Sequence, residues 1–383
     1  MIRAMKDVIG ELAAIAPKFA ERRAEIAEAR QLPPDVVRAL RDAGAFRIAA
    51  PQALGGPELT PREQSEVVET LSYHEASVGW CVMIGSDAPY YGAFLAPDAA
   101  QELWPSIDDV TAGQIPPNGR AVRVDGGYVV NGRWAFGSGI THADVIVGGC
   151  LVMDGDSHAS VDGVPEVIVA CAPASSWNVL DTWYTTGLAG SGSNDYAATD
   201  LFVPERHVFR FGDPVQRPEP LYGWPGMFFV NMGGVALGLT RRAIDEAIAI
   251  ASTKTLLPEF VLLRDTSRAR LAIARAEAQL GAARAYVYDS LDRFWDALLA
   301  GDEPSIEIRV AVALSRAHSF RMAREVAESM SDLIGAAAVY RDHPLEQFVR
   351  DAITMNQHIA AQERMFEMTG ELRLTGHSTM PLI

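Results

Sequence analysis

The chain has 383 residues, and its 33 Lys and Arg against 49 Asp and Glu give a formal net charge of −16. This acidic balance argues against binding to nucleic-acid phosphates, which requires clustered basic residues. It also disfavours adsorption to anionic membranes. Hydrophobic residues form 49% of the chain and charged residues 21%, so a large core is available and disorder is excluded. The length predicts two or three domains.

The cysteine pattern and the N-terminus indicate the compartment. Cys81, Cys150 and Cys171 are widely spaced, and no Cys/His cluster with metal-ligand spacing is present, so we expect neither a disulfide framework nor a metal site. The first residues carry charges throughout and lack an apolar signal core. The chain contains no run of about 18 apolar residues, the length needed to span a bilayer. We therefore expect a reduced, cytoplasmic protein.

The N-terminal third has a helical pattern. Leu12, Ile15 and Phe19 recur at spacings of three and four, which gives one apolar face. Pro34 suits the first turn of a second helix, and Gly44 suits its left-handed C-terminal cap. After a loop, the helical pattern resumes through residues 63–94. We predict an N-terminal helical domain over residues 1–113.

From about Gln114 the pattern changes to strands. Apolar residues 122–130 alternate around an Asp-Gly-Gly turn, which predicts a hairpin. Further strands are predicted at 145–152, 167–172 and 197–203, so residues 114–220 form a middle β domain. Beyond Met227 the helical period returns, and Ala-rich stretches favour close helix packing. The sequence therefore predicts an α+β fold that ends in a helical bundle over residues 221–383.

The segment NGRWAFGSGITHAD, residues 131–144, is the first candidate for chemistry. Gly137 and Gly139 flank Ser138, and glycines let a backbone approach a flat ligand closely. Trp134 or Phe136 could cover the face of a ring. A Gly-rich turn whose aromatics only pack against the core fits the same composition, so these residues alone leave both interpretations open.

A second Gly- and Ser-rich segment follows in TTGLAGSGSNDYAATDLFVPE, residues 185–205. Its small residues from Gly187 to Ser193 offer backbone N–H groups suited to an anion or a ring edge. No helix follows with the spacing of a dinucleotide-binding fingerprint. Taken alone, this is a weak signal for a ligand site.

In order along the chain, these segments resemble the acyl-CoA dehydrogenase fold. The matching motifs are LPPDVVRALRDAGAFRIAAPQALGG (32–56), DGGYVVNGRW (125–134), TTGLAGSGSNDYAATDLFVPE (185–205) and HPLEQFVRD (343–351). The resemblance implies a helical domain, a middle β-barrel or sandwich domain and a C-terminal four-helix bundle. It also implies a homotetramer with flavin between the β domain and the bundle.

The departures from that family distinguish its branches. In the dehydrogenases, a Glu nine residues after the Arg of the Arg-Asp pair removes the substrate α-proton, whereas this chain has Ile359 there. The family's other location for the base lies on the first bundle helix, where this chain reads IASTKTLLPEF (250–260). That segment holds no carboxylate before Glu259. The Arg-x-x-Phe-Gly segment that grips FAD is missing. His358, eight residues after Arg350, resembles instead the flavin-dependent monooxygenases built on this fold.

The resemblance implies the oxygenase component of a two-component monooxygenase. Such enzymes take reduced flavin (FADH2 or FMNH2) from a separate NAD(P)H-dependent flavin reductase. They then use O2 through a flavin C4a-hydroperoxide to hydroxylate a small aromatic molecule, here an indole-like or phenolic one. Ser138, through its hydroxyl or its backbone, is expected to hold the flavin N5–H. His358 is expected to deprotonate the phenol or indole N–H, a contribution of about 10²–10⁴-fold.

The other expected contacts follow from the same resemblance. The flavin is expected to touch Trp134, Phe136, Gly137, Ser138, Gly139, His142, Ser191 and Ser193, with Arg264 at its phosphate. His142 could equally cap its turn. The substrate wall is expected from Trp80, Met83, Ser86, Asp87 and Tyr90, with core packing as the alternative.

Three other functions remain open at this point. The same fold could oxygenate the nitrogen of an amine. An acyl-CoA dehydrogenase could use a relocated base such as Glu259. A degenerate flavin-fold protein could serve only as an assembly partner, without catalysis.

Overall fold

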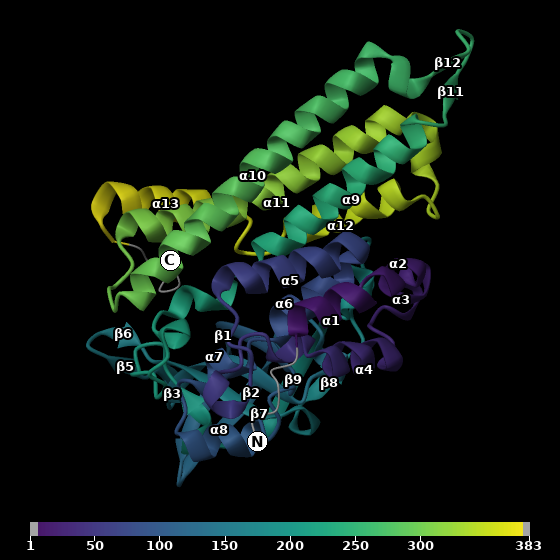
Figure 1. Cartoon of the computed structure of the whole chain (residues 1–383). Coiled ribbons are helices and arrows are strands. Elements are labelled where there is room, and N and C mark those ends of the chain that lie inside the picture. The colour runs from purple at the N-terminus through teal and green to yellow at the C-terminus, as the bar shows by residue number, and fades with distance from the viewer. Residues whose placement is uncertain (1–6, 378–383) are drawn as a thin grey trace.

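The computed structural model describes residues 7–377 and shows helices, then strands, then helices along the chain (Figure 1). The helix predicted from Pro34 ends at Ala43, and Gly44 follows it in the left-handed region with a φ of 88°. Thr60 and Glu63 form a capping box at the start of the first long helix. The N-terminal helices are α1 (Val8–Ile15), α2 (Pro17–Glu21), α3 (Arg23–Ala29), α4 (Pro34–Ala43), α5 (Pro61–His74), α6 (Ala76–Gly85), α7 (Ala88–Gly92) and α8 (Pro97–Leu103).

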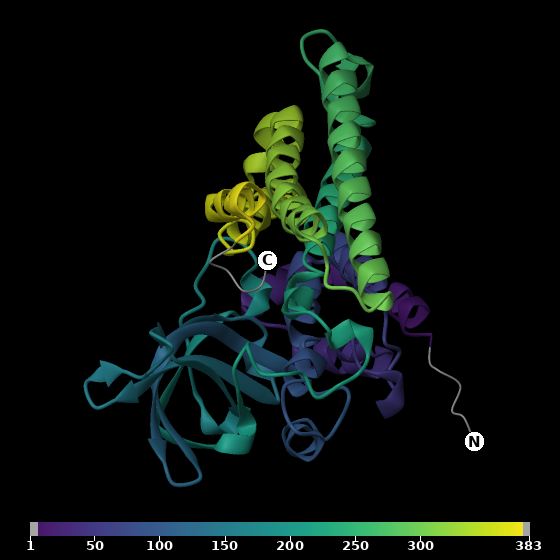
Figure 2. The ribbon, with the colours of Figure 1, turned by 90° about the vertical axis from the view of Figure 1, so that its left-hand side faces the viewer.

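The middle of the chain forms one large sheet whose strand order is β10-β7-β3-β1-β2-β9-β8, with β4 paired to β3. β1 pairs in parallel with β3, and the other neighbours along this path are antiparallel. The sheet curls below the helices (Figure 2). Its strands and the small β5–β6 hairpin are β1 (Thr111–Val124), β2 (Gly127–Gly137), β3 (Val145–Asp154), β4 (Ser157–His158), β5 (Ser160–Val161), β6 (Val164–Pro165), β7 (Val167–Pro173), β8 (Asn178–Leu180), β9 (Asn194–Pro204) and β10 (Val208–Phe209).

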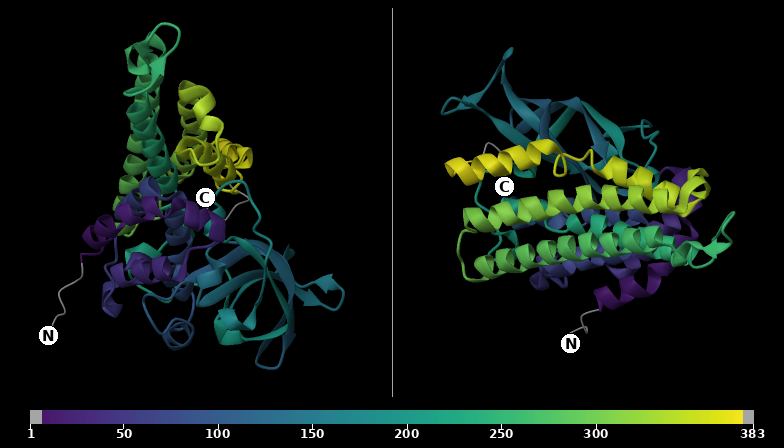
Figure 3. Two further views of the ribbon diagram at one scale, coloured as in Figure 1. Left: turned by 90° about the vertical axis from the view of Figure 1, so that its right-hand side faces the viewer. Right: turned by 90° about the horizontal axis from the view of Figure 1, so that it is seen from above.

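The helices of the C-terminal region run side by side over the sheet domain (Figure 3). They are α9 (Gly233–Ala251), α10 (Ser267–Leu299), α11 (Ile306–Ile334), α12 (Pro344–Met355) and α13 (Glu363–Thr375), with the hairpin β11 (Thr255–Leu256) and β12 (Val261–Leu262) after α9. α9 crosses α5 closely, because a Cβ at Gly234 would lie 2.3 Å from the Ser65 carbonyl oxygen. Glycine there lets the bundle dock against the N-terminal helices.

The predicted α+β fold class is confirmed. The hairpin predicted around Asp125 is the β1–β2 pair, in which Val124 lies opposite Gly127. The first strand begins at Thr111, three residues before the predicted start of the β domain. Within residues 7–377, no helix combines the length and apolar character that a membrane span needs.

Candidate active site

A cavity of about 800 Å³ lies among the β domain, the N-terminal helices and the bundle. Its walls come from β1, the end of β2, the loop before β9, α6 and the turn after α12. The lining residues are Trp80, Ile84, Gly113, Gln114, Pro116, Asn118, Ala135, Phe136, Ser138, Trp183, Thr185, Thr186, Leu188, Ser191, Ser193, Ile353, Thr354, Gln357, His358, Ile359 and Gln362. None of the described residues that line it is Asp, Glu, Lys or Arg, so His358 is the one acid–base side chain among them.

An irregular turn at the end of β2 presents Ser138 to this cavity. The pairing of β2 with β9 shifts register between Trp134 and Gly137. Phe136 and Gly139 both have positive φ values, 64° and 71°. The Ser138 N–H donates to the Phe136 carbonyl at 3.0 Å, which occupies the backbone donor within the turn. The hydroxyl of Ser138 is therefore the donor group of this residue that remains for a ligand.

The two Gly- and Ser-rich segments are joined by hydrogen bonds. The Gly139 N–H donates to the Ser191 carbonyl at 2.8 Å. Ser138 Oγ lies 2.8 Å from Ser193 Oγ, which lies 2.7 Å from Ser191 Oγ. Trp80 Nε1 donates to Ser138 Oγ at 2.9 Å. Since the indole can only donate, Trp80 occupies one lone pair of Ser138 Oγ. The other lone pair and the O–H remain for Ser193 and for a ligand.

The indole of Trp80 also contacts His358, so one side chain touches both candidate catalytic residues. The two rings meet edge to face with centroids 5.7 Å apart and an interplanar angle of 76°. Phe320 of α11 packs edge to face on the same indole at 6.4 Å. The indole is 5% exposed and is held from three sides. Ser138 and His358, 220 residues apart in sequence, thus belong to one site.

His358 is neutral at physiological pH in this environment. Burial, and secondly the positive charge of Arg316, lower the pKa of His358 to about 4. Its Nδ1 accepts a hydrogen bond from the Ala360 N–H at 3.2 Å. A neutral imidazole that accepts at Nδ1 carries its proton on Nε2. The ring is therefore arranged as a hydrogen-bond donor.

The Arg-Asp pair of the HPLEQFVRD motif anchors the loop that lines the cavity. Asp351 Oδ1 accepts from the Leu188 N–H at 2.6 Å, and Arg350 donates to the Thr186 carbonyl at 2.6 Å. Asp351 is buried, and burial together with the nearby Glu75 carboxylate raises the pKa of Asp351. This pair therefore positions the cavity wall from the bundle side.

The geometry does not support a relocated dehydrogenase base. Ile359, which stands at the position of the dehydrogenase Glu, lines the cavity with an apolar side chain. Glu259 lies in the turn of the β11–β12 hairpin, is exposed and does not line the cavity. Abstraction of an α-proton needs a base within hydrogen-bond reach. Neither residue supplies one.

Most of the predicted flavin contacts gather at the cavity. Phe136, Ser138, Ser191 and Ser193 line it, while Gly137 and Gly139 shape the turn beside it. Phe136 is 62% exposed and lies edge to face with Trp183, so its ring is available to a ligand.

Three predicted contacts are not at this cavity. Trp134 is fully buried in the β domain, where it stacks on Tyr196 at 5.4 Å and donates to the Gly149 carbonyl. His142 packs near Phe46 with ring centroids 5.9 Å apart, and neither of its ring nitrogens has a hydrogen-bond partner among the described residues. Burial lowers the pKa of His142 to about 4. Arg264 is exposed and follows β12 of the β11–β12 hairpin, and Figure 1 shows this hairpin at one end of the bundle. None of the three lines the predicted flavin site within this chain.

The predicted substrate wall needs a similar correction. Of its five residues only Trp80 lines the cavity, and the neighbouring Ile84, which was not predicted, lines it too. The other four are core residues: Met83, Ser86, Asp87 and Tyr90 are all buried within the helical region. The loop residues from Trp183 to Leu188 and the β1 residues from Gly113 to Asn118 were missed as well. No local motif marks them, because they meet the site only through the folding of distant segments.

Asp87 carries a stability prediction. It is buried, its Oδ1 has no partner, and burial raises its pKa well above the ordinary value. The folded protein keeps this carboxyl protonated, whereas the unfolded chain ionises it above its ordinary pKa of about 4. The free energy of unfolding is therefore highest below about pH 4 and falls as pH rises towards the folded pKa. We expect Asp87→Asn to raise the melting temperature at pH 8 but not at pH 4. Asp125→Asn, exposed in the β1–β2 turn, is the matched control. An equal shift at both pH values would contradict this account.

Comparisons with known proteins agree with the geometry. The family described as acyl-CoA dehydrogenase, C-terminal domain, matches residues 230–363, and the N-terminal domain family matches residues 4–96. Indole-3-acetate monooxygenase of Pseudomonas putida is 33% identical over 92% of this chain and 89% of its own length. The flavin-dependent monooxygenase oxygenase subunit HsaA of Rhodococcus jostii is 28% identical over 96% of this chain and 99% of its own. The crystal structure of a 3-HSA hydroxylase from a Rhodococcus species superposes with a TM-score of 0.89 at 26% identity, covering 98% of this chain and 99% of that one.

The fold and these relatives define a class, the oxygenase components of flavin-dependent monooxygenases. The chain belongs to this monooxygenase branch of the acyl-CoA dehydrogenase superfamily. It is an oxidoreductase, and reduced flavin and O2 are the cofactor and co-substrate of its class. The cavity residues fit a flat flavin ring, since the turn at Ser138 brings backbone and hydroxyls to its edge without any competing charge.

Proposed function

We propose that this protein is the oxygenase half of a two-component system that hydroxylates a small aromatic molecule, indole-like or phenolic, through a flavin C4a-hydroperoxide. The observation that carries this proposal is the uncharged cavity in which Trp80 joins Ser138 to His358. A site that must protect a reactive oxygenated flavin has to exclude water and stray protons. Relatives named for indole-3-acetate and resorcinol support an aromatic substrate.

Ser138 is assigned to the flavin N5–H through its hydroxyl. Its oxygen accepts from Trp80 and can donate its own proton to Ser193, which leaves one lone pair. The backbone N–H of Ser138 is already bonded to Phe136. A hydrogen bond from N5–H to the free lone pair would retain the proton whose loss releases H2O2. We therefore assign this role to the hydroxyl, whose oxygen lies at the cavity between Trp80 and Ser193.

His358 is assigned a donor role, which revises the predicted base. With Nδ1 accepting from Ala360, a base at Nε2 would need both nitrogens unprotonated, that is, an imidazolate. The neutral ring would instead offer its Nε2–H to an oxygen atom of the ligands bound in the cavity. In a cavity lined by no charged side chain, such a neutral donor would stabilise developing negative charge effectively.

The remaining partners follow from family membership. We propose that FADH2 or FMNH2 is delivered by a separate NAD(P)H-dependent flavin reductase, because relatives are named oxygenase subunit or component. We also propose a homotetramer.

A coupled assay tests the proposal. Purified protein, O2, NADH and an unrelated flavin reductase with FMN or FAD would be incubated with indole or phenol derivatives, and products identified by mass spectrometry. We expect a product heavier by one oxygen atom, which carries ¹⁸O when ¹⁸O2 is supplied. Omitting the protein must leave only H2O2. If bound flavin is instead bleached by acyl-CoA thioesters without O2, the protein is a dehydrogenase and this proposal is wrong.

A further inference from the structure

Arg316 is a buried cation that has no counter-ion among residues 7–377. It lies in the middle of α11 and is 4% exposed. In the described part of the chain, its Nε has no hydrogen-bond partner, and its Nη2 contacts the Met365 sulfur at 3.9 Å, a weak acceptor. The guanidinium also lies over the Phe229 ring at 4.9 Å. No carboxylate within the described residues forms an ion pair with Arg316.

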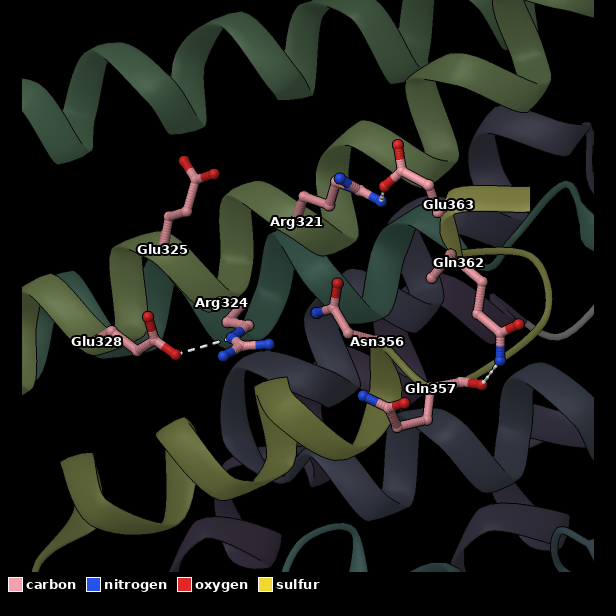
Figure 4. A pocket seen from close by; sticks show the side chains of 9 residues that line it. Arg321, Arg324, Glu325, Glu328, Asn356, Gln357, Gln362 and Glu363 are labelled. Carbon is pink, nitrogen blue, oxygen red and sulfur yellow. Dashed lines mark hydrogen bonds and ion pairs between the residues drawn. The ribbon is translucent and has the colours of Figure 1, made fainter. Parts of the chain in front are cut away.

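The other arginines of α11 show how unusual this is. Arg324 pairs with Glu328 at 2.8 Å, and Arg321 pairs with Glu363, both around a polar groove on the bundle surface (Figure 4). Arg309 lies 3.9 Å from Glu303. These three pairs are accessible to water, whereas Arg316 is enclosed by apolar groups. Burying an unpaired charge is costly, and burial lowers the pKa of Arg316 to about 10.

The position of Arg316 relates it to the active site. After burial, its positive charge contributes to lowering the pKa of His358, which lines the cavity. One helical turn further along α11, Phe320 packs on Trp80. Arg316 is not itself a lining residue, and the Met365 side chain fills the space at its Nη2. Met side chains are flexible and readily displaced.

We propose that Arg316 binds the carboxylate of the substrate, so that the substrate class is an aromatic ring carrying a short carboxylate side chain. The inference rests on the proposed function and narrows its substrate. The ring would lie in the cavity beside Trp80, and the carboxylate would reach past His358 and replace the Met365 sulfur at the guanidinium. A guanidinium fork suits a carboxylate, and one monoanion neutralises its single charge.

A pair of isosteric ligands tests the charge requirement. Indole-3-acetate and indole-3-acetamide differ in charge but hardly in shape. We expect the wild-type protein to bind the acid about 10- to 100-fold more tightly, as measured by equilibrium dialysis and by KM. Arg316→Met should remove this preference and leave binding of the amide unchanged. Arg324→Met, which breaks a surface pair on the same helix, should keep it.

The stability of the variant separates binding from a structural role. Replacing an unpaired buried charge with an apolar side chain is often neutral or stabilising. We therefore expect Arg316→Met to melt within about 2 °C of the wild type or above it, and the acid to raise the melting temperature of the wild type only. A large loss of stability, or equal binding of acid and amide by the wild type, overturns the inference. Failure of the proposed function is distinct, because it would appear as absence of oxygenated product with either ligand.

Discussion

Ser138→Ala is expected to uncouple the enzyme, so that O2 consumption continues while aromatic product nearly disappears. The substitution removes the acceptor of Trp80 Nε1 and the bridge to Ser193. It also removes the lone pair assigned to the flavin N5–H. Losing a hydrogen bond of this kind costs about 1.5–3 kcal/mol, which corresponds to a lifetime of the oxygenated flavin about 10- to 100-fold shorter. Stopped-flow absorbance and the yield of H2O2 measure both effects.

Two further variants serve as controls for that result. Ser138→Thr keeps a hydroxyl at the same atom and should restore much of the coupling. Ser176→Ala removes an exposed hydroxyl elsewhere in the β domain and should behave like the wild type. If Ser138→Ala retained both product yield and the lifetime of the oxygenated species, its hydroxyl would have no part in the reaction.

His358 substitutions are expected to separate a donor from a base. Gln places an N–H near the position of Nε2, so His358→Gln should retain substantial activity, whereas His358→Leu should lose about 100-fold or more of the hydroxylation rate. A base would be lost in both variants. The comparison of single-turnover product formation therefore distinguishes the two roles.

The pH dependence gives an independent check on His358. Because burial and Arg316 lower its pKa to about 4, the ring stays neutral as pH falls through 6.5 and gains a proton only near pH 4. We expect product yield per reduced flavin to remain flat between about pH 5.5 and 8. A limb near pH 6.5 that disappears in His358→Gln would show that the ring titrates at its ordinary value and would contradict the donor assignment.

The parts of the fold that were predictable have strong local signals. Pro34 and Gly44 mark the two ends of α4, and the Asp-Gly-Gly turn marks the β1–β2 hairpin. Ser138 and His358 were identified through family motifs, and the structure places both on the same cavity. Trp80, which contacts both residues, brings together segments that are far apart in sequence. Local periodicity carries no information about such contacts.

The errors have physical causes that the sequence pattern conceals. Trp134 and Phe136, two residues apart, would face the same side of a regular strand. The register shift and the positive φ of Phe136 direct one ring into the β-domain core and the other to the cavity. α6 is apolar around most of its circumference, so no periodic stripe distinguishes Ile84, which lines the cavity, from Met83, which does not. In the sequence, Arg316 looks like any other arginine of a helix. Its burial without an ion-pair partner among the described residues is visible only in the structure.

Anaerobic mixing of the protein with chemically reduced FMN or FAD, followed by addition of O2 in a stopped-flow spectrometer, tests whether this cavity is a monooxygenase site. We expect a long-lived absorbance of a flavin C4a adduct before oxidised flavin appears. Addition of an aromatic carboxylate should accelerate the decay of that adduct, because hydroxylation of the substrate consumes it. Reoxidation that shows no such adduct and is no faster than that of free flavin would contradict the assignment of this cavity as a monooxygenase site.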